Sequence, residues 1–149
     1  MSDNLASTRL FTRQDMRNED LMVGDWFRFR YTIDGKEIVK TFRIRRTADD
    51  IGYVWGEGFG RMCIPERLEP IPLTAEILEK NFGEKIDEMF FDGDEFYELF
   101  IHEINDGTWI IKHDNIEFSN IPRQQVMVGY VHELQHALRL CGIEKEVVL

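Results

Sequence analysis

The string His132-Glu133-Leu134-Gln135-His136 has residue types and a spacing that could do chemistry. It matches the pattern His-Glu-x-x-His, in which two histidines one helical turn apart bind Zn²⁺ and the glutamate acts as a general base. One interpretation is therefore a zinc-dependent hydrolase, with His132 and His136 as metal ligands and Glu133 as the catalytic base.

The helical phase of this string favours a non-catalytic interpretation. On a helix predicted from about 123 to 141, Leu134 lies at the centre of an apolar stripe. His132 and His136 fall about 160° away from it, so we expect both to face solvent or a partner, with no cofactor bound. A third interpretation is adventitious or structural metal binding by the two histidines. A catalytic zinc would need a third protein ligand, and the candidates lack a diagnostic spacing: His102, His113 and Glu144.

A second candidate site lies in a predicted β-hairpin near the N-terminus. Aromatic residues alternate with Arg28 and Arg30, and Asp34-Gly35 has the residue types of a tight hairpin turn. If Ile33 pairs with Lys36, then Phe27 faces Phe42 and Tyr31 faces Ile38. The opposite face then carries four arginines: Arg28, Arg30, Arg43 and Arg45.

These four arginines have two interpretations that the sequence leaves open. Neighbouring guanidinium groups suit bidentate contact with phosphates, which predicts weak nucleic-acid binding through the hairpin. The alternative is a solvated face neutralised by the acidic second half of the chain.

The charge of the 149-residue chain is uneven. Residues 1–47 carry ten Lys/Arg against seven Asp/Glu, whereas residues 48–149 carry eight against twenty-one, which gives a net charge of −10. Because the acidic part repels phosphates, only the first part is expected to face a polyanion. The stretch 84–106 has nine carboxylates and one lysine. This composition fits mimicry of DNA phosphates, binding of a basic host protein, or ordinary turn chemistry on a solvated edge.

Apolar residues are too interrupted by charge for a membrane span, which needs about 18 to 20 in a row. We therefore expect a cytoplasmic protein without membrane contact, in which Cys63 and Cys141 are reduced thiols. Gly56-Glu57-Gly58-Phe59-Gly60 lacks the Lys-Ser/Thr of a nucleotide-binding loop and predicts a hairpin instead.

The pattern of elements predicts an α+β fold. Residues 1–20 form an arm, 21–70 an SH3-like small β-barrel of four or five strands, and 71–149 an α+β domain. In this last part a short helix follows Thr74 and ends at Gly83. An antiparallel sheet with strands at 85–91, 95–104, 108–113 and 116–119 comes next, and the 123–141 helix, which ends at Gly142, packs on it. Residues 147–149 form a last strand or a docking tail.

Three segments, 21–26, 69–83 and 130–149, resemble a family of small uncharacterised proteins encoded by prophages and mobile elements of Bacteroidetes-type bacteria. The resemblance covers the chain from about residue 20 to its end. In that family Gln often stands at the place of Glu133, and Asn sometimes at that of His136, and either change removes zinc-hydrolase chemistry. The resemblance implies that Tyr130, Leu134 and Leu138 are packing residues. It also implies that the His-Glu-x-x-His string is incidental and that no activity can be carried over. Our leading hypothesis is a non-catalytic binding or interaction module of phage or mobile-element origin. Its partner is unknown, with a host or phage protein as one candidate, and the acidic second half and the basic hairpin are the surfaces to test.

Overall fold

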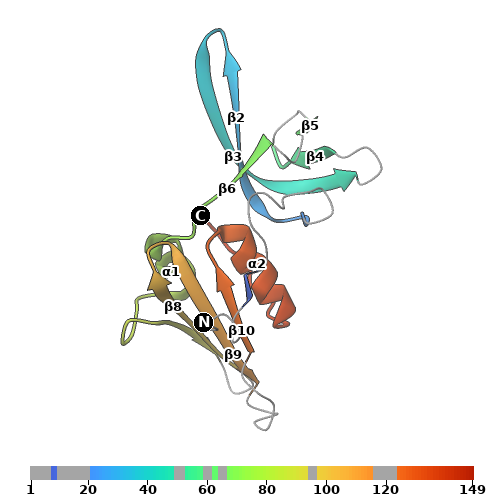
Figure 1. Ribbon diagram of the computed structural model, residues 1–149. Coiled ribbons are helices and arrows are strands. Elements are labelled where there is room, and N and C mark those ends of the chain that lie inside the picture. The colour runs from blue at the N-terminus through green and yellow to red at the C-terminus, as the bar shows by residue number, and fades with distance from the viewer. Residues whose placement is uncertain are drawn as a thin grey trace. The chain divides into compact units, whose positions relative to one another are not determined.

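The computed structural model describes residues 8–9, 21–48, 53–58, 62–63, 67–93, 97–115 and 124–149. They divide into two compact units (Figure 1). The N-terminal unit comprises the described residues from 21 to 71, and the C-terminal unit comprises residues 72–149 together with the strand Thr8–Arg9. Each unit has a five-stranded sheet, and both helices belong to the C-terminal unit, so the predicted α+β class is confirmed.

The sheet of the N-terminal unit is an antiparallel meander. Its strands are β2 (Trp26–Ile33), β3 (Lys36–Ala48), β4 (Tyr53–Gly56), β5 (Met62–Cys63) and β6 (Leu68–Pro70). They lie in the order β5-β4-β3-β2-β6, because β6 returns to pair with β2. Among the described strands β5 and β6 stay at opposite edges, so the sheet is open there and does not close into a barrel.

The predicted hairpin register is confirmed. Ile33 pairs with Lys36, Phe27 with Phe42 and Tyr31 with Ile38. The turn residues Asp34 and Gly35 have φ values of 51° and 77°, as a type I′ turn requires. A left-handed conformation is easy for glycine and tolerable for aspartate, which is why this dipeptide fixes the turn and with it the register.

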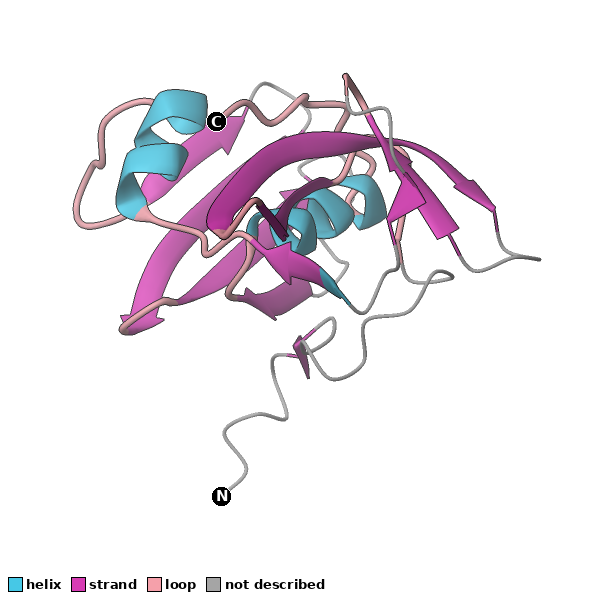
Figure 2. Ribbon diagram, turned by 90° about the horizontal axis from the view of Figure 1, so that it is seen from above, coloured by secondary structure: helices cyan, strands magenta, loops and turns pink. Residues whose placement is uncertain are grey.

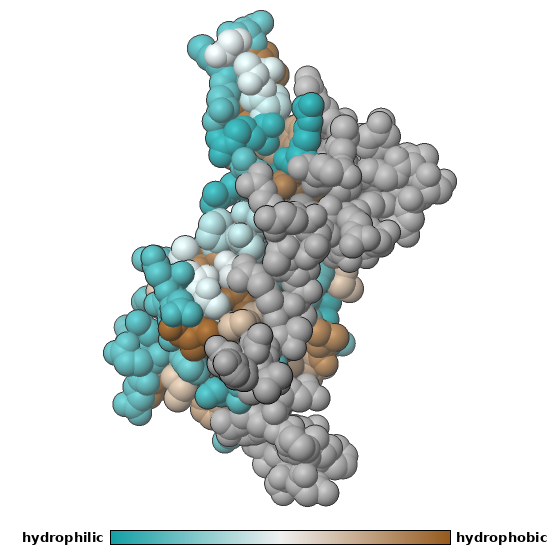
Figure 3. Space-filling view, viewed as in Figure 1, coloured by the Kyte–Doolittle hydropathy of each residue, from teal (hydrophilic) through white to brown (hydrophobic). Residues whose placement is uncertain are grey.

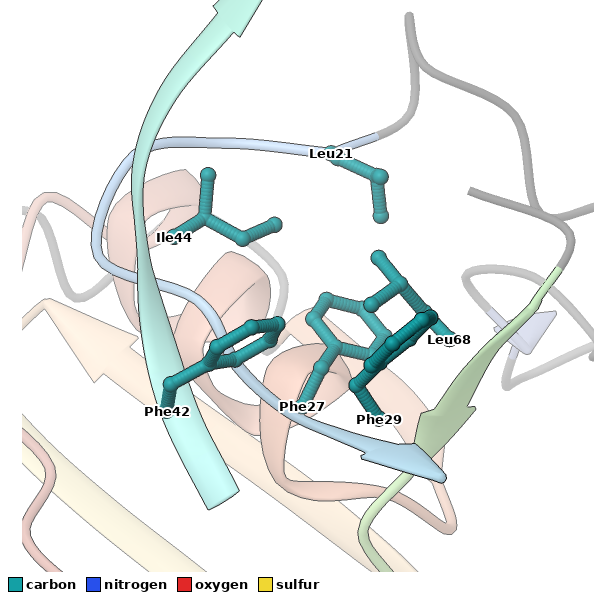
Figure 4. Packing of buried hydrophobic residues seen from close by; sticks show 6 residues of the cluster. All are labelled: Leu21, Phe27, Phe29, Phe42, Ile44 and Leu68. Atoms are coloured by element: carbon teal, nitrogen blue, oxygen red, sulfur yellow. The ribbon is translucent and has the colours of Figure 1, made fainter. Parts of the chain in front are cut away.

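The core of the N-terminal unit forms on one face of this hairpin (Figure 4). The alternating residues Phe27 and Phe29 of β2 are buried there, with Tyr31 packed against them. Burial of each such side chain is worth about 1.5–3 kcal/mol, so this cluster stabilises the unit. Its six buried members are Leu21, Phe27, Phe29, Phe42, Ile44 and Leu68.

The sheet of the C-terminal unit has the order β1-β10-β9-β8-β7. The strands are β1 (Thr8–Arg9), β7 (Phe90–Gly93), β8 (Tyr97–Asn105), β9 (Thr108–Asn115) and β10 (Gln124–Val128). All pairs are antiparallel except β1 with β10, which is parallel. Helix α1 (Ala75–Phe82) packs beside β7 and helix α2 (Val131–Leu140) beside β10 (Figure 2). Neither described helix has the length and apolar character needed to cross a bilayer.

Helix α1 has the ends that the sequence predicts. The Thr74 hydroxyl oxygen accepts a hydrogen bond from the backbone N–H of Ile77 at 3.3 Å, and Gly83 ends the helix with a φ of 83°. The predicted docking tail also forms, because Val147 is buried and Asn81 of α1 holds Val148 through both backbone groups.

The prediction of one helix from 123 to 141 is wrong in its first part. Residues Gln124–Val128 are strand β10, and the helix begins only at Val131. Val126 and Val128 alternate in a way that suits β10, whose neighbours β9 and β1 satisfy its backbone. The chain then turns through Gly129 and Tyr130 into α2.

Smaller differences affect the first hairpin of the C-terminal unit. The predicted strand 85–91 begins later, at Phe90, because Asp87 and Glu88 take positive φ values of 53° and 64° in a turn. Asp92 and Gly93, which lie between the predicted strands 85–91 and 95–104, belong to β7. The predicted strand 116–119 and the arm 1–20, apart from Thr8–Arg9, lie outside the described residues.

Candidate functional site

The start of α2 positions the His-Glu-x-x-His string. Tyr130 is the residue before the first helical turn, with an extended φ of −131°, and Glu133 is therefore the third helical residue. Its Oε1 accepts hydrogen bonds from the backbone N–H of Gly129 at 2.9 Å and of Tyr130 at 3.2 Å. A carboxylate at this position satisfies backbone donors that have no partner in the helix and lies at the positive end of the helix dipole.

This role of Glu133 differs from that of a general base. A base must direct its carboxylate at a reacting water, whereas the carboxylate of Glu133 is fully buried and bound to backbone N–H groups. The sequence signal for it was a glutamate three residues after the start of a helix. That signal was missed because the helix was predicted to begin near residue 123.

His132 and His136 are neighbours, but not in the way that the helical phase predicted. His132 is fully buried, its ring stacked on Tyr130 with 6.0 Å between centroids and an interplanar angle of 15°. Its edge contact with the His136 ring spans 5.8 Å at 83°. The expectation that both histidines face away from the core is therefore wrong for His132, and His136 is half-buried. The reason is that α2 is enclosed on all sides at its start, where residues 131–135 are all buried.

Burial also determines the protonation state of His132. Desolvation, with a smaller contribution from the nearby His136, lowers the pKa of His132 to about 2. The ring is therefore neutral throughout the physiological range.

The donor set does not fit a catalytic zinc. No three His, Cys, Asp or Glu side chains form a metal-binding group within the described part of the chain. His113 pairs with Leu99 and His102 with Ile110, which places the two candidate third ligands on opposite faces of the sheet. Glu144 is exposed beyond the end of α2. Among the described residues the geometry thus provides neither a third zinc ligand nor a glutamate carboxylate directed at a reacting water.

The two cysteines lie in different units. Cys141, at the end of α2, has a free, half-buried thiol, and burial raises the pKa of this thiol. It is therefore a thiol and not a reactive thiolate at neutral pH. Cys63 lies in β5, and its side chain is outside the described set.

The hairpin brings three of the four predicted arginines to one face. Trp26 pairs with Arg43, Arg28 with Thr41 and Arg30 with Val39, so Arg28, Arg30 and Arg43 share the face opposite Phe27. Arg45 lies where the pairing of β3 with β4 shifts, between Ile44 and Arg46. Arg45 is exposed. Because of the register shift, the strand pairing does not determine on which face of the sheet its side chain lies.

Arg30 is bound by carboxylates of its own unit. Its Nε and Nη2 donate to the two carboxylate oxygens of Glu69 at 3.0 and 3.2 Å, and Nη1 donates to Glu37. These hydrogen bonds raise the pKa of Arg30 above its already high ordinary value. The bidentate pair links β2 to β6 across 39 residues of sequence, which adds a side-chain contact to two strands that already pair through their backbones.

Arg43 is also engaged. Its Nη2 lies 3.2 Å from Glu57 Oε1, and its guanidinium carbon lies 5.4 Å from the centre of the Trp26 ring. By contrast, Arg28 and Arg45 make no ion pair within the described residues. The carboxylates that pair with this face among the described residues are Glu37, Glu57 and Glu69, all of the N-terminal unit. Glu57 and Glu69 lie in the acidic part 48–149, as expected, whereas Glu37 does not.

The net charge of the protein belongs entirely to the C-terminal unit. Residues 11–71 carry eleven Lys/Arg and eleven Asp/Glu, whereas the other residues carry seven and seventeen. The hairpin therefore belongs to a unit whose net charge is zero. Part of the acidic stretch 84–106 serves turns, since Glu103 Oε2 accepts from the N–H of Gly107 at 3.1 Å and Glu88 lies 3.8 Å from the Lys85 ammonium.

Comparison of the chain with protein-family models, curated proteins and solved structures finds no match.

Proposed function

We propose that this chain is a non-catalytic binding or interaction module of phage or mobile-element origin. The observation that carries the proposal is the position of Glu133, whose Oε1 accepts from the backbone N–H of Gly129 at 2.9 Å and of Tyr130 at 3.2 Å. A glutamate used in this way starts a helix, and the histidines around it pack. The His-Glu-x-x-His string then stabilises the start of α2, and partners bind at other surfaces of the protein.

The resemblance to prophage and mobile-element proteins supports the same conclusion. It implies Gln at the place of Glu133 in many members. Glutamine keeps the carbonyl oxygen that can accept from the backbone N–H groups, but it is not a general base. A position that accepts either residue suits a helix cap better than a hydrolase.

For the N-terminal unit we propose an SH3-like fold. The support is the strand order, in which a meander of four strands is followed by a fifth, β6, that returns to the first, β2. SH3-like folds host many unrelated functions, and the function of each protein depends on the surface that it presents.

Elemental analysis of protein purified without an affinity tag tests the proposal. We expect substoichiometric zinc and no hydrolytic activity. Stoichiometric zinc that is lost in His132→Ala or His136→Ala, with hydrolysis that also fails in Glu133→Gln, would overturn it.

Two substitutions at Glu133 give a readout that does not depend on metal. As a cap, Glu133→Gln should retain most of the stability, whereas Glu133→Ala should lose about 1–3 kcal/mol because buried N–H groups lose their acceptor. Glu79→Ala, an exposed carboxylate on α1, is the control and should change little. Equal stability of the alanine and glutamine variants would contradict a capping role.

A further inference from the structure

The β2–β3 hairpin extends beyond the strands that flank it. Strand β6 pairs with Phe27–Phe29 of β2, and β4 pairs with β3 only from Ile44 onward. Within the described residues, 30–41 therefore form a two-stranded ribbon without a third strand, which stands clear of the rest of its unit in Figure 1.

The outer part of this ribbon is exposed on both faces. Residues 32–37 and 39–41 are all exposed, including Ile33 at 40% and Val39 at 41%. Figure 3 shows one face of the hairpin at the top of the view, with both hydrophilic and hydrophobic residues at its surface. A two-stranded hairpin is marginal by itself in water. This ribbon has a tight turn at its tip, is continuous at its base with the strands of the core, and gains side-chain contacts from Arg30 to Glu37 and Glu69. The chain thus stabilises a protruding element that contributes little to its own core.

The charge of the ribbon and its base is positive. Residues 28–45 carry six Lys/Arg and two Asp/Glu. Lys36 and Lys40 pair with Ile33 and Phe29, so they lie on the face of the aromatic residues, whereas Arg28 lies on the opposite face. Lys36, Lys40 and Arg28 make no ion pair within the described residues.

We propose that this ribbon binds duplex nucleic acid by entering a groove. This inference rests on the proposed function as a binding module and names the partner of that module. The major groove is about 12 Å wide and admits a two-stranded β-ribbon. A ribbon in a groove has a phosphate backbone on each side. Cations on its two faces can therefore reach both backbones, with Lys36 and Lys40 on one face and Arg28 on the other.

The remaining residues fit this arrangement. The side chains of Ile33 and Val39, exposed near the tip, can make apolar contacts with base edges. Arg30 and Arg43, held by carboxylates, keep the ribbon in register and do not contact phosphate. The acidic C-terminal unit weakens binding, but the Debye length of about 8 Å at physiological salt lets a protruding cationic element act locally.

Fluorescence anisotropy of the full chain with a short labelled duplex, and with one of its single strands, tests the proposal at low and rising salt. Contacts from Lys36, Lys40 and Arg28 predict a log–log salt slope of about −2.7 on the duplex. The double variant Lys36→Ala/Lys40→Ala should reduce its magnitude to about 0.9. Binding to the single strand should be weaker than binding to the duplex.

The matched control is Lys80→Ala/Lys85→Ala, which removes the same charge from exposed positions of the C-terminal unit. It should retain the full slope. Three outcomes would overturn the proposal: no duplex binding at low salt, equal losses in the two double variants, or tighter binding of the single strand.

Self-association through the open strand edges, measured by light scattering without any oligonucleotide binding, would also overturn it, since a second copy would then be the occupant. None of these outcomes affects zinc content or the Glu133 variants, so failure here is distinguishable from failure of the proposed function.

Discussion

The ring of Phe42 lies against the backbone of Gly56, so that a Cβ atom at position 56 would stand 1.9 Å from Cδ2 of Phe42. No side chain fits there unless the ring moves, and the ring is buried in the core of the N-terminal unit. Glycine is therefore required by the close approach of β4 to Phe42.

Gly56→Ala should destabilise the N-terminal unit by about 1–3 kcal/mol because it overpacks the core. Urea unfolding measures the change. The double variant Gly56→Ala/Phe42→Leu should lose less than the sum of its two single variants, because the smaller side chain makes room. Strict additivity would show that the two residues do not compete for space.

Leu134→Ala should lower the free energy of unfolding by about 2–5 kcal/mol, because the side chain is fully buried on α2 and its removal leaves a cavity. Leu140→Ala on the same helix is the control, since Leu140 is 68% exposed. Thermal or urea unfolding should separate the two clearly. Similar losses would mean that the packing of α2 is described wrongly.

Stability should fall as the pH is lowered from 6.5, in part because of His132. Its pKa is about 2 in the folded state against 6.5 ordinarily, so between these values only the unfolded chain binds the proton. Each pH unit below 6.5 should then remove up to about 1.4 kcal/mol through this group. Urea unfolding at several pH values should show a shallower acid dependence in His132→Phe, which keeps an aromatic ring against Tyr130. An unchanged slope would contradict the burial of a neutral histidine.

Asn81→Ala should release the C-terminal tail. The Asn81 side chain donates to Val148 O at 2.8 Å, accepts from Val148 N at 2.9 Å and donates to Ile77 O at 2.8 Å. Hydrogen exchange at Val148 should become faster in the variant, with a loss of about 1–2 kcal/mol in stability. Glu76→Ala, exposed on the same helix, should leave that exchange unchanged. Unaltered protection in Asn81→Ala would show that other contacts hold the tail.

The sequence by itself determined the elements whose signals are local. Asp34-Gly35 fixed the turn and thereby the pairing of Phe27 with Phe42, and Thr74 and Gly83 fixed both ends of α1. These signals are reliable because a left-handed turn or a helix cap depends on residues that are close together in the chain.

The tertiary structure alone decided which segment became β10 and what the candidate site residues do. Residues 124–128 could continue a helix or form a strand, and pairing with β9 and β1 selects the strand. That choice moves the start of α2, which turns Glu133 from a possible base into a cap. Likewise, Arg30 is held by Glu69, 39 residues away. Such contacts depend on chain segments brought together by folding, and no local period or spacing encodes them.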